Sequence, residues 1–418
     1  MSDIENRRER LFAKMKENSA ALFFAGTPKI RSEDETYPFV SNRHFYYLSN
    51  IEQENSVLLF VKGISEKKIY LFIDDFSELK EKWTGKRLTV TEARNLSRIQ
   101  NVYLNNSFES MLSLALTNKN NQYGKIDTLY LDLSPELKIK ESYSTQEFEQ
   151  FILSEYPFIK TINVYPMVTE LRMIKSSEEI GEVLNAINGT NNGIGQLISV
   201  IKPGVVEKEL ADTFEFFGRK HGFRELSFPS IVASGKNATC LHYPSQNDPL
   251  KENDLILFDI GYKSHGYSAD ISRTFPVNGI FTGLAKEVYQ AVLNCNKAVI
   301  EYVRAEMTLA QLQEFARNFL KKECVKIGIL GEDEDVIKYY YHNVSHHLGL
   351  DTHDCSDREK PLENGNIITV EPGLYLVDKG IGVRIEDNIL ISNGRGECLS
   401  KGIVKEIKDI ERLFKTRF

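Results

Sequence analysis

Residues 255–276 read LILFDIGYKSHGYSADISRTFP, and this stretch predicts a β-hairpin that carries one aspartate in each strand. Apolar residues fill both arms, and the polar residues 263–266 between them are typical of a turn. A turn centred on those residues places Asp259 opposite Asp270, where Cβ atoms lie about 4.5–5.5 Å apart. Two half-buried carboxylates in that position need a compensating charge, such as a divalent metal ion. The alternative is a solvated hairpin with acids at its edge.

A second stretch of the same kind, IITVEPGLYLVDKGIGVRIEDN, occupies residues 367–388. A turn centred on residues 378–379 places Glu371 opposite Glu386 in its two strands. Pro372, which glycine follows, also permits a bulge that would change this second register. Two hairpins that each oppose two carboxylates favour a metal site over a solvated edge.

The order of elements around the two hairpins repeats, which indicates one domain built from two related halves. In each half, two predicted helices precede a histidine-bearing stretch and then the hairpin. The helices cover residues 177–201 and 207–221 in the first half, and 284–303 and 309–327 in the second. We therefore expect an α+β domain with an internal pseudo-two-fold repeat and a site where its halves meet.

The preceding part of the chain alternates between predicted helices and strands, which indicates a separate α/β domain. Its helices are predicted at residues 3–18, 91–99, 107–116 and 144–154, and its strands at 20–26, 44–51, 56–63, 68–75, 128–134 and 161–166. This part contains one histidine, His44, and no cluster of residues that typically bind metals. We therefore expect the chemistry to lie in the second domain.

The boundary between the two domains is predicted near Val168, which gives domains 1–167 and 168–418. A polar, basic passage begins at Thr169 and leads to a helix start that Ser176 or the next serine can cap. Acidic residues follow directly and are favourable in the first turn of that helix.

The composition narrows the class of protein. The 418 residues carry a formal charge of −7, which argues against nucleic acid as a partner. The five cysteines are scattered and unpatterned, as in proteins of a reducing compartment. Residues 1–19 contain no apolar signal region, and the longest apolar runs are far shorter than a membrane span. We therefore expect a cytoplasmic protein that binds neither nucleic acid nor a membrane.

Four histidines lie close together in the sequence, downstream of the first pair of acids, and such a cluster indicates a site. They are His342, His346, His347 and His353. The four hairpin carboxylates carry a charge of −4, which two divalent cations would neutralise. Two metals about 3.5–4 Å apart activate water and stabilise the oxygens of a hydrolytic transition state. Oxygen-rich ligation with one imidazole favours Mn²⁺, with Co²⁺ and Zn²⁺ as alternatives.

These motifs resemble those of the pita-bread metallopeptidases, and within them the chain is most similar to the bacterial aminopeptidase P group, the Xaa-Pro aminopeptidases. The resemblance rests on His342, His346 and His353, on the DIG, SAD and RTF segments of the first hairpin, on Glu371-Pro-Gly-Leu-Tyr and on Val383-Arg-Ile-Glu386. Residues 31–51, RSEDETYPFVSNRHFYYLSNI, resemble a creatinase-like N-terminal domain. The resemblance implies an α/β N-terminal domain followed by an α+β pita-bread catalytic domain.

The resemblance implies five metal ligands, Asp259, Asp270, His346, Glu371 and Glu386. Asp259 would hold one metal, His346 with Glu371 the other, and Asp270 with Glu386 would bridge them. The implied reaction hydrolyses the bond between an N-terminal residue and a following proline, using a hydroxide that bridges the metals. The implied partners are peptides with proline in second position, and the expected assembly is a homodimer or homotetramer.

The resemblance also implies roles for residues around the metals. Glu371 would pass a proton from the water to the imide nitrogen of the substrate. His242 and His353 would donate to the substrate carbonyl and to the developing oxyanion. His342 would line the pocket for proline.

Other side chains have weaker assignments. Arg384 and Tyr375 resemble groups that orient an aspartate ligand, although a strand salt bridge and a packed ring would explain them equally. His347 is expected to be a bystander, because its neighbour fits the ligand position. His221 and His265 are expected at the surface.

Three alternatives stay open at this point. A prolidase would accept only dipeptides that end in proline, so the length of the tolerated peptide distinguishes it. A pita-bread binding protein without catalysis, or a metal-free creatinase-like enzyme, would lack the five-ligand set.

Trp83 resembles a residue that closes the site of a neighbouring subunit, or it is a half-exposed packing residue.

Overall fold

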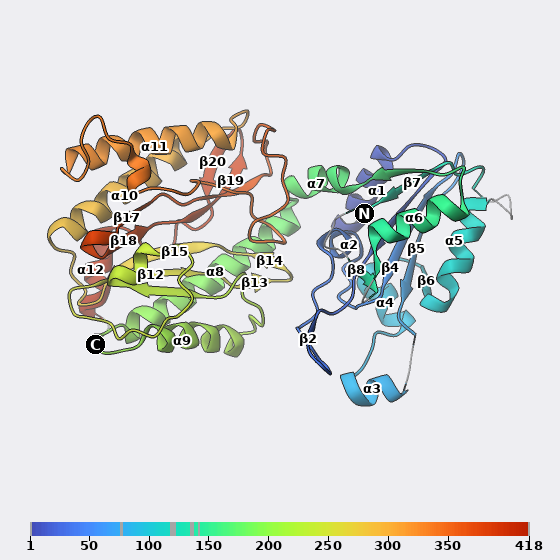
Figure 1. Cartoon of the computed structure of the whole chain (residues 1–418), viewed down its shortest axis with the longest axis horizontal. Coiled ribbons are helices and arrows are strands. Elements are labelled where there is room, and N and C mark those ends of the chain that lie inside the picture. Colours follow the sequence, from blue (N-terminus) through green and yellow to red (C-terminus); the bar gives the residue numbers. More distant parts are fainter. Residues whose placement is uncertain (1, 76–77, 118–122, 134–137, 141–142, 417–418) are drawn as a thin grey trace. The chain divides into compact units, whose positions relative to one another are not determined.

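The chain folds into two compact units, described here from a computed structural model (Figure 1). The structure describes residues 2–75, 78–117, 123–133, 138–140 and 143–416. The N-terminal unit is Met1–Arg172 and the C-terminal unit is Met173–Phe418. This division falls a few residues after the predicted boundary at Val168, because helix α7 (Tyr165–Met173) continues through that position.

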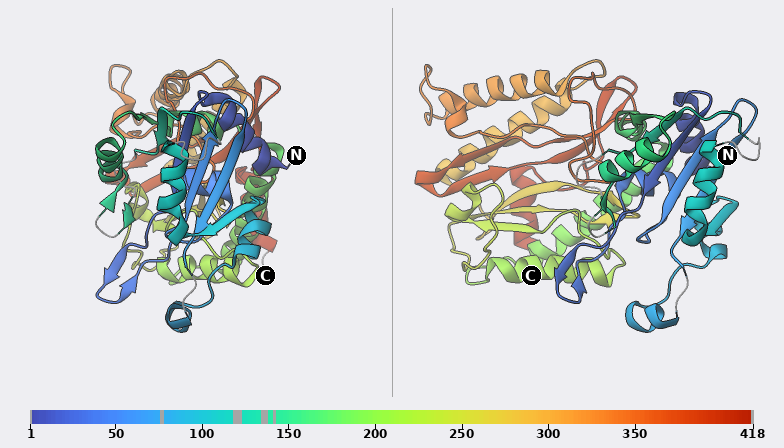
Figure 2. Two further views of the ribbon diagram at one scale, coloured as in Figure 1. Left: turned by 90° about the vertical axis from the view of Figure 1, so that its right-hand side faces the viewer. Right: turned by 45° about the vertical axis from the view of Figure 1, so that its right-hand side comes forward.

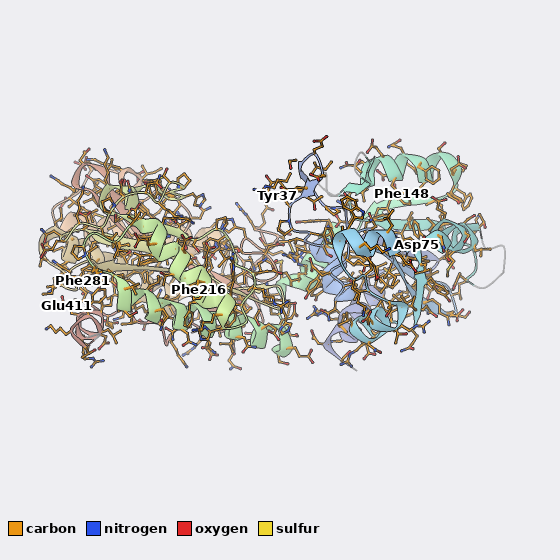
Figure 3. All side chains as sticks on the ribbon, turned by 90° about the horizontal axis from the view of Figure 1, so that it is seen from below. Tyr37, Asp75, Phe148, Phe216, Phe281 and Glu411 are labelled. Atoms are coloured by element: carbon orange, nitrogen blue, oxygen red, sulfur yellow. The ribbon has the colours of Figure 1, made fainter. Side chains whose placement is uncertain are left out.

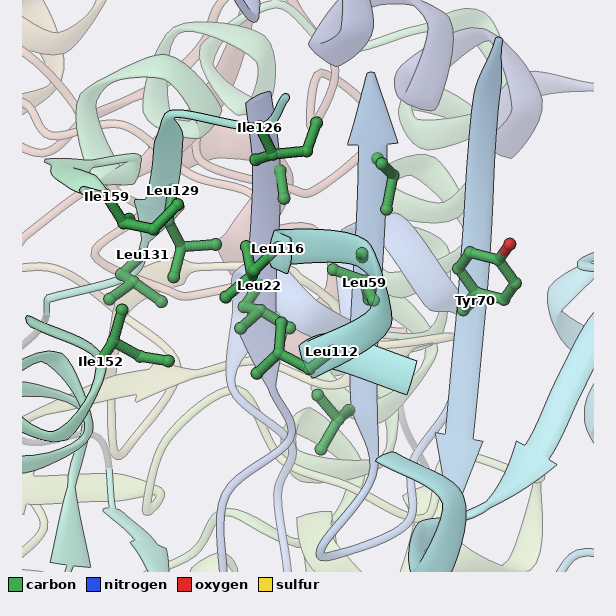
Figure 4. Close-up of a cluster of buried hydrophobic side chains, with 14 of the residues drawn as sticks. Leu22, Leu59, Tyr70, Leu112, Leu116, Ile126, Leu129, Leu131, Ile152 and Ile159 are labelled. Atoms are coloured by element: carbon green, nitrogen blue, oxygen red, sulfur yellow. The ribbon is translucent and has the colours of Figure 1, made fainter. Parts of the chain in front are cut away.

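The N-terminal unit is built on a six-stranded mixed sheet with the strand order β10-β7-β1-β4-β5-β6. The strands are β1 (Ser19–Phe24), β4 (Val57–Lys62), β5 (Lys67–Ile73), β6 (Asn101–Leu104), β7 (Thr128–Leu131) and β10 (Lys160–Asn163). Leu112 and Leu116 of α5 (Phe108–Thr117) pack with Leu22 and Leu59 on one face of the sheet (Figure 4). Burial on both faces explains why the central strands are apolar without alternation.

Helices and short strands complete the N-terminal unit. The further helices are α1 (Asp3–Lys14), α2 (Arg43–Ser49), α3 (Glu78–Thr84), α4 (Val90–Ser97), α6 (Thr145–Glu155) and the 3₁₀ turn η1 (Asn105–Ser107). The strands β2 (Ile30–Ser32) and β3 (Glu35–Thr36) form one small hairpin, and β8 (Lys138–Lys140) and β9 (Tyr143–Ser144) form another.

The strand predicted over residues 44–51 is wrong, because this segment forms helix α2. The Asn42 side chain accepts hydrogen bonds from the backbone N–H groups of His44 and Phe45, at 2.9 and 3.0 Å, and so starts a helix. Asn50 adopts the left-handed conformation that ends it. Local capping therefore overrides the aromatic residues, whose strand preference depends on context.

The C-terminal unit repeats one order of elements, as predicted. Helices α8 (Ser177–Val200) and α9 (Glu207–Lys220) precede the 3₁₀ turn η2 (Gly235–Thr239) and the first hairpin. Helices α10 (Gly283–Tyr302) and α11 (Leu309–Lys326) precede η3 (Val336–Lys338) and the second hairpin. The two helix pairs lie on opposite sides of the strands (Figures 1 and 2).

The strands of the C-terminal unit form short antiparallel ladders between these helices. They are β11 (Ile231–Ser234), β12 (Leu255–Ile260), β13 (Lys263–Ser264), β14 (Tyr267–Ser268), β15 (Ile271–Pro276), β16 (Ile367–Val370), β17 (Gly373–Leu376), β18 (Ile381–Arg384), β19 (Asp387–Ser392) and β20 (Arg395–Cys398). The 3₁₀ turn η4 (Val377–Lys379) joins β17 to β18. Helix α12 (Ile407–Thr416) follows, and its Glu411 accepts a hydrogen bond from the Phe281 N–H at 3.1 Å (Figure 3).

The first hairpin forms where predicted, but its register differs from the prediction. The turn is the pair His265-Gly266, and both residues have positive φ, at 44° and 83°. This two-residue turn matches the twist of a hairpin better than the predicted longer one. Asp259 therefore pairs with Ser272 and not with Asp270. Because the shift is two residues, both aspartates stay on one face as diagonal neighbours.

The second hairpin has the predicted register. Gly373 pairs with Arg384 beside the turn, and Val370 pairs with Asp387 on the far side of the two glutamates. The ladder runs through Pro372 without a shift, so Glu371 and Glu386 lie directly opposite each other. Among the residues that the structure describes, none of the helices combines the length and the apolar character that a membrane span requires.

Candidate metal centre

The two hairpins and the histidine-bearing loop bring the predicted ligands together in the C-terminal unit. Asp259 lies near the end of β12, and Asp270 lies directly before β15. Glu371 lies between β16 and β17, and Glu386 lies between β18 and β19. The hairpins are joined because the Glu386 N–H donates to the Ser272 carbonyl at 3.0 Å.

Three of the predicted ligands are already close enough to share one ion. Donor atoms of Asp270, His346 and Glu386 all lie within 4.8 Å of one another. His346 Nε2 lies 3.3 Å from Asp270 Oδ2 and 3.6 Å from Glu371 Oε1. Glu371 therefore belongs to the same cluster, which contains one imidazole and three carboxylates.

Asp259 is joined to this cluster by Ser272. The Ser272 hydroxyl lies 3.0 Å from Asp259 Oδ1 and 2.8 Å from Glu386 Oε2. Sequence reasoning did not identify Ser272, because the predicted register placed Asp270 opposite Asp259. A prediction with a two-residue turn would have placed Ser272 opposite Asp259.

Three of the four carboxylates are buried, Glu371 is partly exposed, and too few positive charges lie beside them to neutralise all four. The exposed fractions are 8% for Asp259, 4% for Asp270 and 2% for Glu386. Burial, together with neighbouring carboxylates, raises the pKa of Asp270 and of Glu386 well above the usual range. The same causes raise the pKa of Glu371 to about 8.

One buried oxygen also lacks a partner. Glu386 Oε1 has no hydrogen-bond partner within the residues that the structure describes. Buried polar atoms without partners are rare, and an ion is one explanation. The unpaired oxygen, the four acids and the hard-oxygen character of the set fit two divalent cations.

His346 has the geometry of a metal ligand. Its Nδ1 lies 3.0 Å from the backbone carbonyl of His347, which can only accept a hydrogen bond. Nδ1 therefore carries the proton, and the lone pair of Nε2 points towards Asp270 and Glu371. Such an outer hydrogen bond fixes tautomer and orientation in metal-binding histidines.

Arg384 is a cation buried beside the acids. Its Nη2 donates to Asp259 Oδ2 at 2.7 Å, and its Nε donates to the Ser272 hydroxyl at 2.7 Å. Its Nη1 contacts the Tyr375 hydroxyl at 3.1 Å. Arg384 therefore contacts Asp259 directly, and Tyr375 contacts Arg384.

Three more of the predicted histidines lie at or near the cluster of acids. His342 Nε2 contacts the Tyr375 hydroxyl at 2.9 Å, and burial lowers the pKa of His342 to about 3. The rings of His353 and His346 are 4.2 Å apart, and burial lowers the pKa of His353. His242 follows η2 and is exposed.

Three histidines lie outside the cluster of acids. His347 is buried, pairs with Ile368 and carries a pKa that burial lowers to about 3. His221 is exposed, and His265 in the hairpin turn contacts Glu182 at 3.0 Å. Trp83 of α3, in the other unit, is 80% exposed.

A cavity of about 1110 Å³ opens onto the acids and continues along helix α11. Its inner part is lined by the cluster and by His242, His342 and His353. Its outer part is lined by polar residues of α11, among them Gln313, Arg317 and Lys321. The cavity therefore leads from the outside to the carboxylates past several hydrogen-bonding side chains.

Known proteins match the chain over almost its whole length. Residues 182–393 match the profile of metallopeptidase family M24, and residues 4–123 match that of the aminopeptidase P, N-terminal domain. The Xaa-Pro aminopeptidase of Haemophilus influenzae is 35% identical, over 98% of this chain and 96% of its own length. That of Escherichia coli is 30% identical, over 98% of this chain and 97% of its own.

Solved structures show the same similarity. The structure of a putative aminopeptidase P from Bacillus anthracis has a TM-score of 0.94 and 38% identity, and the match covers 99% of this chain and 98% of that chain. Aminopeptidase P from Escherichia coli, in a low-pH form, has a TM-score of 0.90 and 29% identity, over 100% of this chain and 99% of that chain.

Proposed function

Because this chain belongs to metallopeptidase family M24, we propose that it is a metal-dependent Xaa-Pro aminopeptidase. It would hydrolyse the bond between an N-terminal residue and a following proline. The family, and an α/β N-terminal domain joined to an α+β pita-bread catalytic domain, were both predicted from the sequence and are confirmed. The full-length relatives named Xaa-Pro aminopeptidase support the proposed specificity.

The observation that carries the proposal is the buried cluster of acids around one imidazole. Asp259 would hold one cation and His346 with Glu371 the other, and Asp270 with Glu386 would complete the set of ligands. When bound, two divalent cations supply an activated water and stabilise the oxygens of the transition state. Hard-oxygen ligands support Mn²⁺, while a Zn-substituted E. coli aminopeptidase P among the similar structures keeps Zn²⁺ as an alternative.

Glu371 is the residue we assign to proton transfer. Its Oε1 faces His346 at 3.6 Å, and its Oε2 lies 3.6 Å from His342 Nδ1 on the other side. One oxygen can therefore bind a cation while the other accepts a proton from the attacking water. The same oxygen would then deliver the proton to the imide nitrogen, which needs it to leave.

Histidines along the cavity would bind and orient the peptide. The lowered pKa of His353 keeps its ring neutral near pH 7, so one ring N–H can donate to the substrate carbonyl. We assign the same role to His242, and the proline pocket to His342. Removing one oxyanion donor typically costs about 10²–10³-fold in kcat.

The length of the cavity favours an aminopeptidase over a strict prolidase. The space continues beyond the acids along α11, so a peptide chain after the proline has room. The test compares Mn²⁺-loaded protein on Ala-Pro-Ala-Ala, Ala-Ala-Ala-Ala and Ala-Pro. We expect alanine release from the first and little from the second. Cleavage of Ala-Pro alone would establish a prolidase, and cleavage of none would support a binding protein.

We also propose that the protein works in the cytoplasm and that it forms a homodimer or homotetramer. The five cysteines are all free, which supports a reducing compartment such as the cytoplasm. A homodimer or homotetramer is supported by the large exposed apolar side chains of the N-terminal unit, among them Leu79 and Trp83 of α3. Light scattering on the purified protein would determine the number of subunits.

A further inference from the structure

Helix α10 places one amide side chain directly behind the two opposed glutamates. Asn296 is fully buried, and its Nδ2 donates to the backbone carbonyls of Val370 and Ile385, both at 3.2 Å. Val370 directly precedes Glu371, and Ile385 directly precedes Glu386. One side chain therefore contacts the backbone of both strands where each one carries a glutamate.

The ladder needs such a donor at this point. Pro372 lies opposite Ile385, and the Ile385 N–H donates to the Pro372 carbonyl at 3.3 Å. Proline has no N–H, so it cannot return a hydrogen bond to the Ile385 carbonyl. The Asn296 amide supplies this missing donor from outside the sheet.

Glu371 and Glu386 also make no backbone hydrogen bond to each other. The Glu371 N–H donates to Val344, and the Glu386 N–H donates to Ser272. In antiparallel sheets such a pair is the closer kind, with Cα atoms about 4.5 Å apart. The separation of the two glutamates therefore depends on the hydrogen bonds on either side of them.

Charged side chains fix the orientation of the Asn296 amide. Lys405 Nζ lies 2.8 Å from Asn296 Oδ1, and an ammonium group only donates, so the oxygen must face it. The same ammonium group contacts Asp387 Oδ2 at 2.6 Å. Arg273 contacts Asp387 Oδ1 at 2.8 Å and donates to the Glu386 carbonyl at 2.6 Å. The amide is thus held with its N–H groups towards both strands.

We propose that Asn296 is a positioning residue that sets the separation of Glu371 and Glu386 and thereby the affinity of the metal centre. The inference rests on the proposed function only in that these glutamates bind cations. Asn296 is not among the residues that line the cavity, and its hydrogen bonds go to the two strands and to Lys405, so it acts through the strands. Outer partners of metal ligands typically change metal affinity about 10–100-fold when removed.

The test is Mn²⁺ binding to the metal-free protein by isothermal titration calorimetry, with thermal unfolding of each metal-free variant. Asn296→Asp keeps the size of the side chain and an acceptor for Lys405 but removes both N–H groups. Cys295→Ala is the matched control, because Cys295 is equally buried on the same helix and its thiol donates to the Ala316 carbonyl of α11, at 3.8 Å, instead of to the two strands. Lys405→Met is a second variant, which removes the group that orients the amide.

We expect Asn296→Asp to weaken Mn²⁺ binding about 10–100-fold, and Lys405→Met to weaken it in the same direction. Cys295→Ala should lower the melting temperature and keep the wild-type affinity. Wild-type affinity in a folded Asn296→Asp or Lys405→Met protein overturns the inference. So does an equal loss of affinity in Cys295→Ala, which would show that affinity simply follows the stability of α10. A wild-type protein that binds no Mn²⁺ would instead contradict the proposed function.

Discussion

Replacing Lys175 should destabilise the C-terminal unit strongly, because it leaves a carboxylate buried without its counter-ion. Lys175 Nζ lies 3.0 Å from Asp354 Oδ2, and both side chains are 1% exposed. Breaking a buried pair by removing one partner costs about 3–5 kcal/mol, because the remaining charge is uncompensated. The unit has little room to relax, since a Cβ atom on Gly349 would already lie 2.3 Å from Asp354 Oδ2.

The size of the effect can be separated from a simple loss of packing. For a domain of roughly this size, 1 kcal/mol shifts the melting temperature by about 2–4 °C. Lys175→Met should therefore lower it by roughly 6–20 °C. The double variant Lys175→Met with Asp354→Asn removes both charges and keeps the shapes, so it should recover most of the loss.

The assay is thermal and urea unfolding of the wild type, both single variants and the double variant, with and without Mn²⁺. Each single variant should unfold at a lower temperature and a lower urea concentration than the double variant. This difference would correspond to a coupling free energy of several kcal/mol between Lys175 and Asp354. A Lys175→Met protein within about 1 kcal/mol of the wild type would refute the reasoning, since that is the range of exposed pairs. A double variant less stable than both singles would refute it equally.

Three further predictions follow from the hairpins and the acids. Gly261→Ala should lower the free energy of unfolding, measured by urea titration, by about 3 kcal/mol, because the new Cβ would lie 1.9 Å from the Ala269 carbonyl oxygen. The control is Gly181→Ala in α8, whose new Cβ meets nothing within 4 Å, and it should be neutral or slightly stabilising in the same titration. Removing metal with a chelator should lower the melting temperature, and Mn²⁺ at about 100 times its Kd should restore about 2.7 kcal/mol per site, whereas an unchanged melting temperature would contradict a metal site among the acids. Glu371→Ala should reduce kcat by at least about 10²–10⁴-fold with the fold intact by circular dichroism, and substantial remaining turnover would contradict its assignment to proton transfer.

Much of the C-terminal unit could be predicted because its signals are local. The helices α8 to α11 follow apolar periodicity and caps such as Ser176, which accepts a hydrogen bond from the Glu179 N–H at 3.2 Å. The second hairpin has the predicted register on both sides of Pro372, because the β16–β19 pair and the β17–β18 pair continue the same alignment. Periodicity of two residues per face therefore sufficed to place Glu371 opposite Glu386.

Other features depended on information that the pattern did not contain. The first hairpin shifted by two residues because His265 adopts a positive φ, which a non-glycine residue does only in special turns. Helix α2 was predicted as a strand because its aromatic residues occur in strands as well as in helices. The hydrogen bonds to the Asn42 side chain start a helix there instead. The buried Asn296 contacts join segments far apart in the sequence, so no local signal indicates them. Ser272 was missed because the predicted register of the first hairpin was shifted by two residues.

The most direct test of the central claim is the dependence of alanine release from Ala-Pro-Ala-Ala on added Mn²⁺, starting from metal-free protein. The cluster of Asp259, Asp270, His346, Glu371 and Glu386 predicts that activity rises until two equivalents per chain are bound and then stays constant. A matched titration with Ala-Ala-Ala-Ala should show little release at any metal content. Full activity without metal, or equal release from both peptides, would contradict a two-metal Xaa-Pro aminopeptidase.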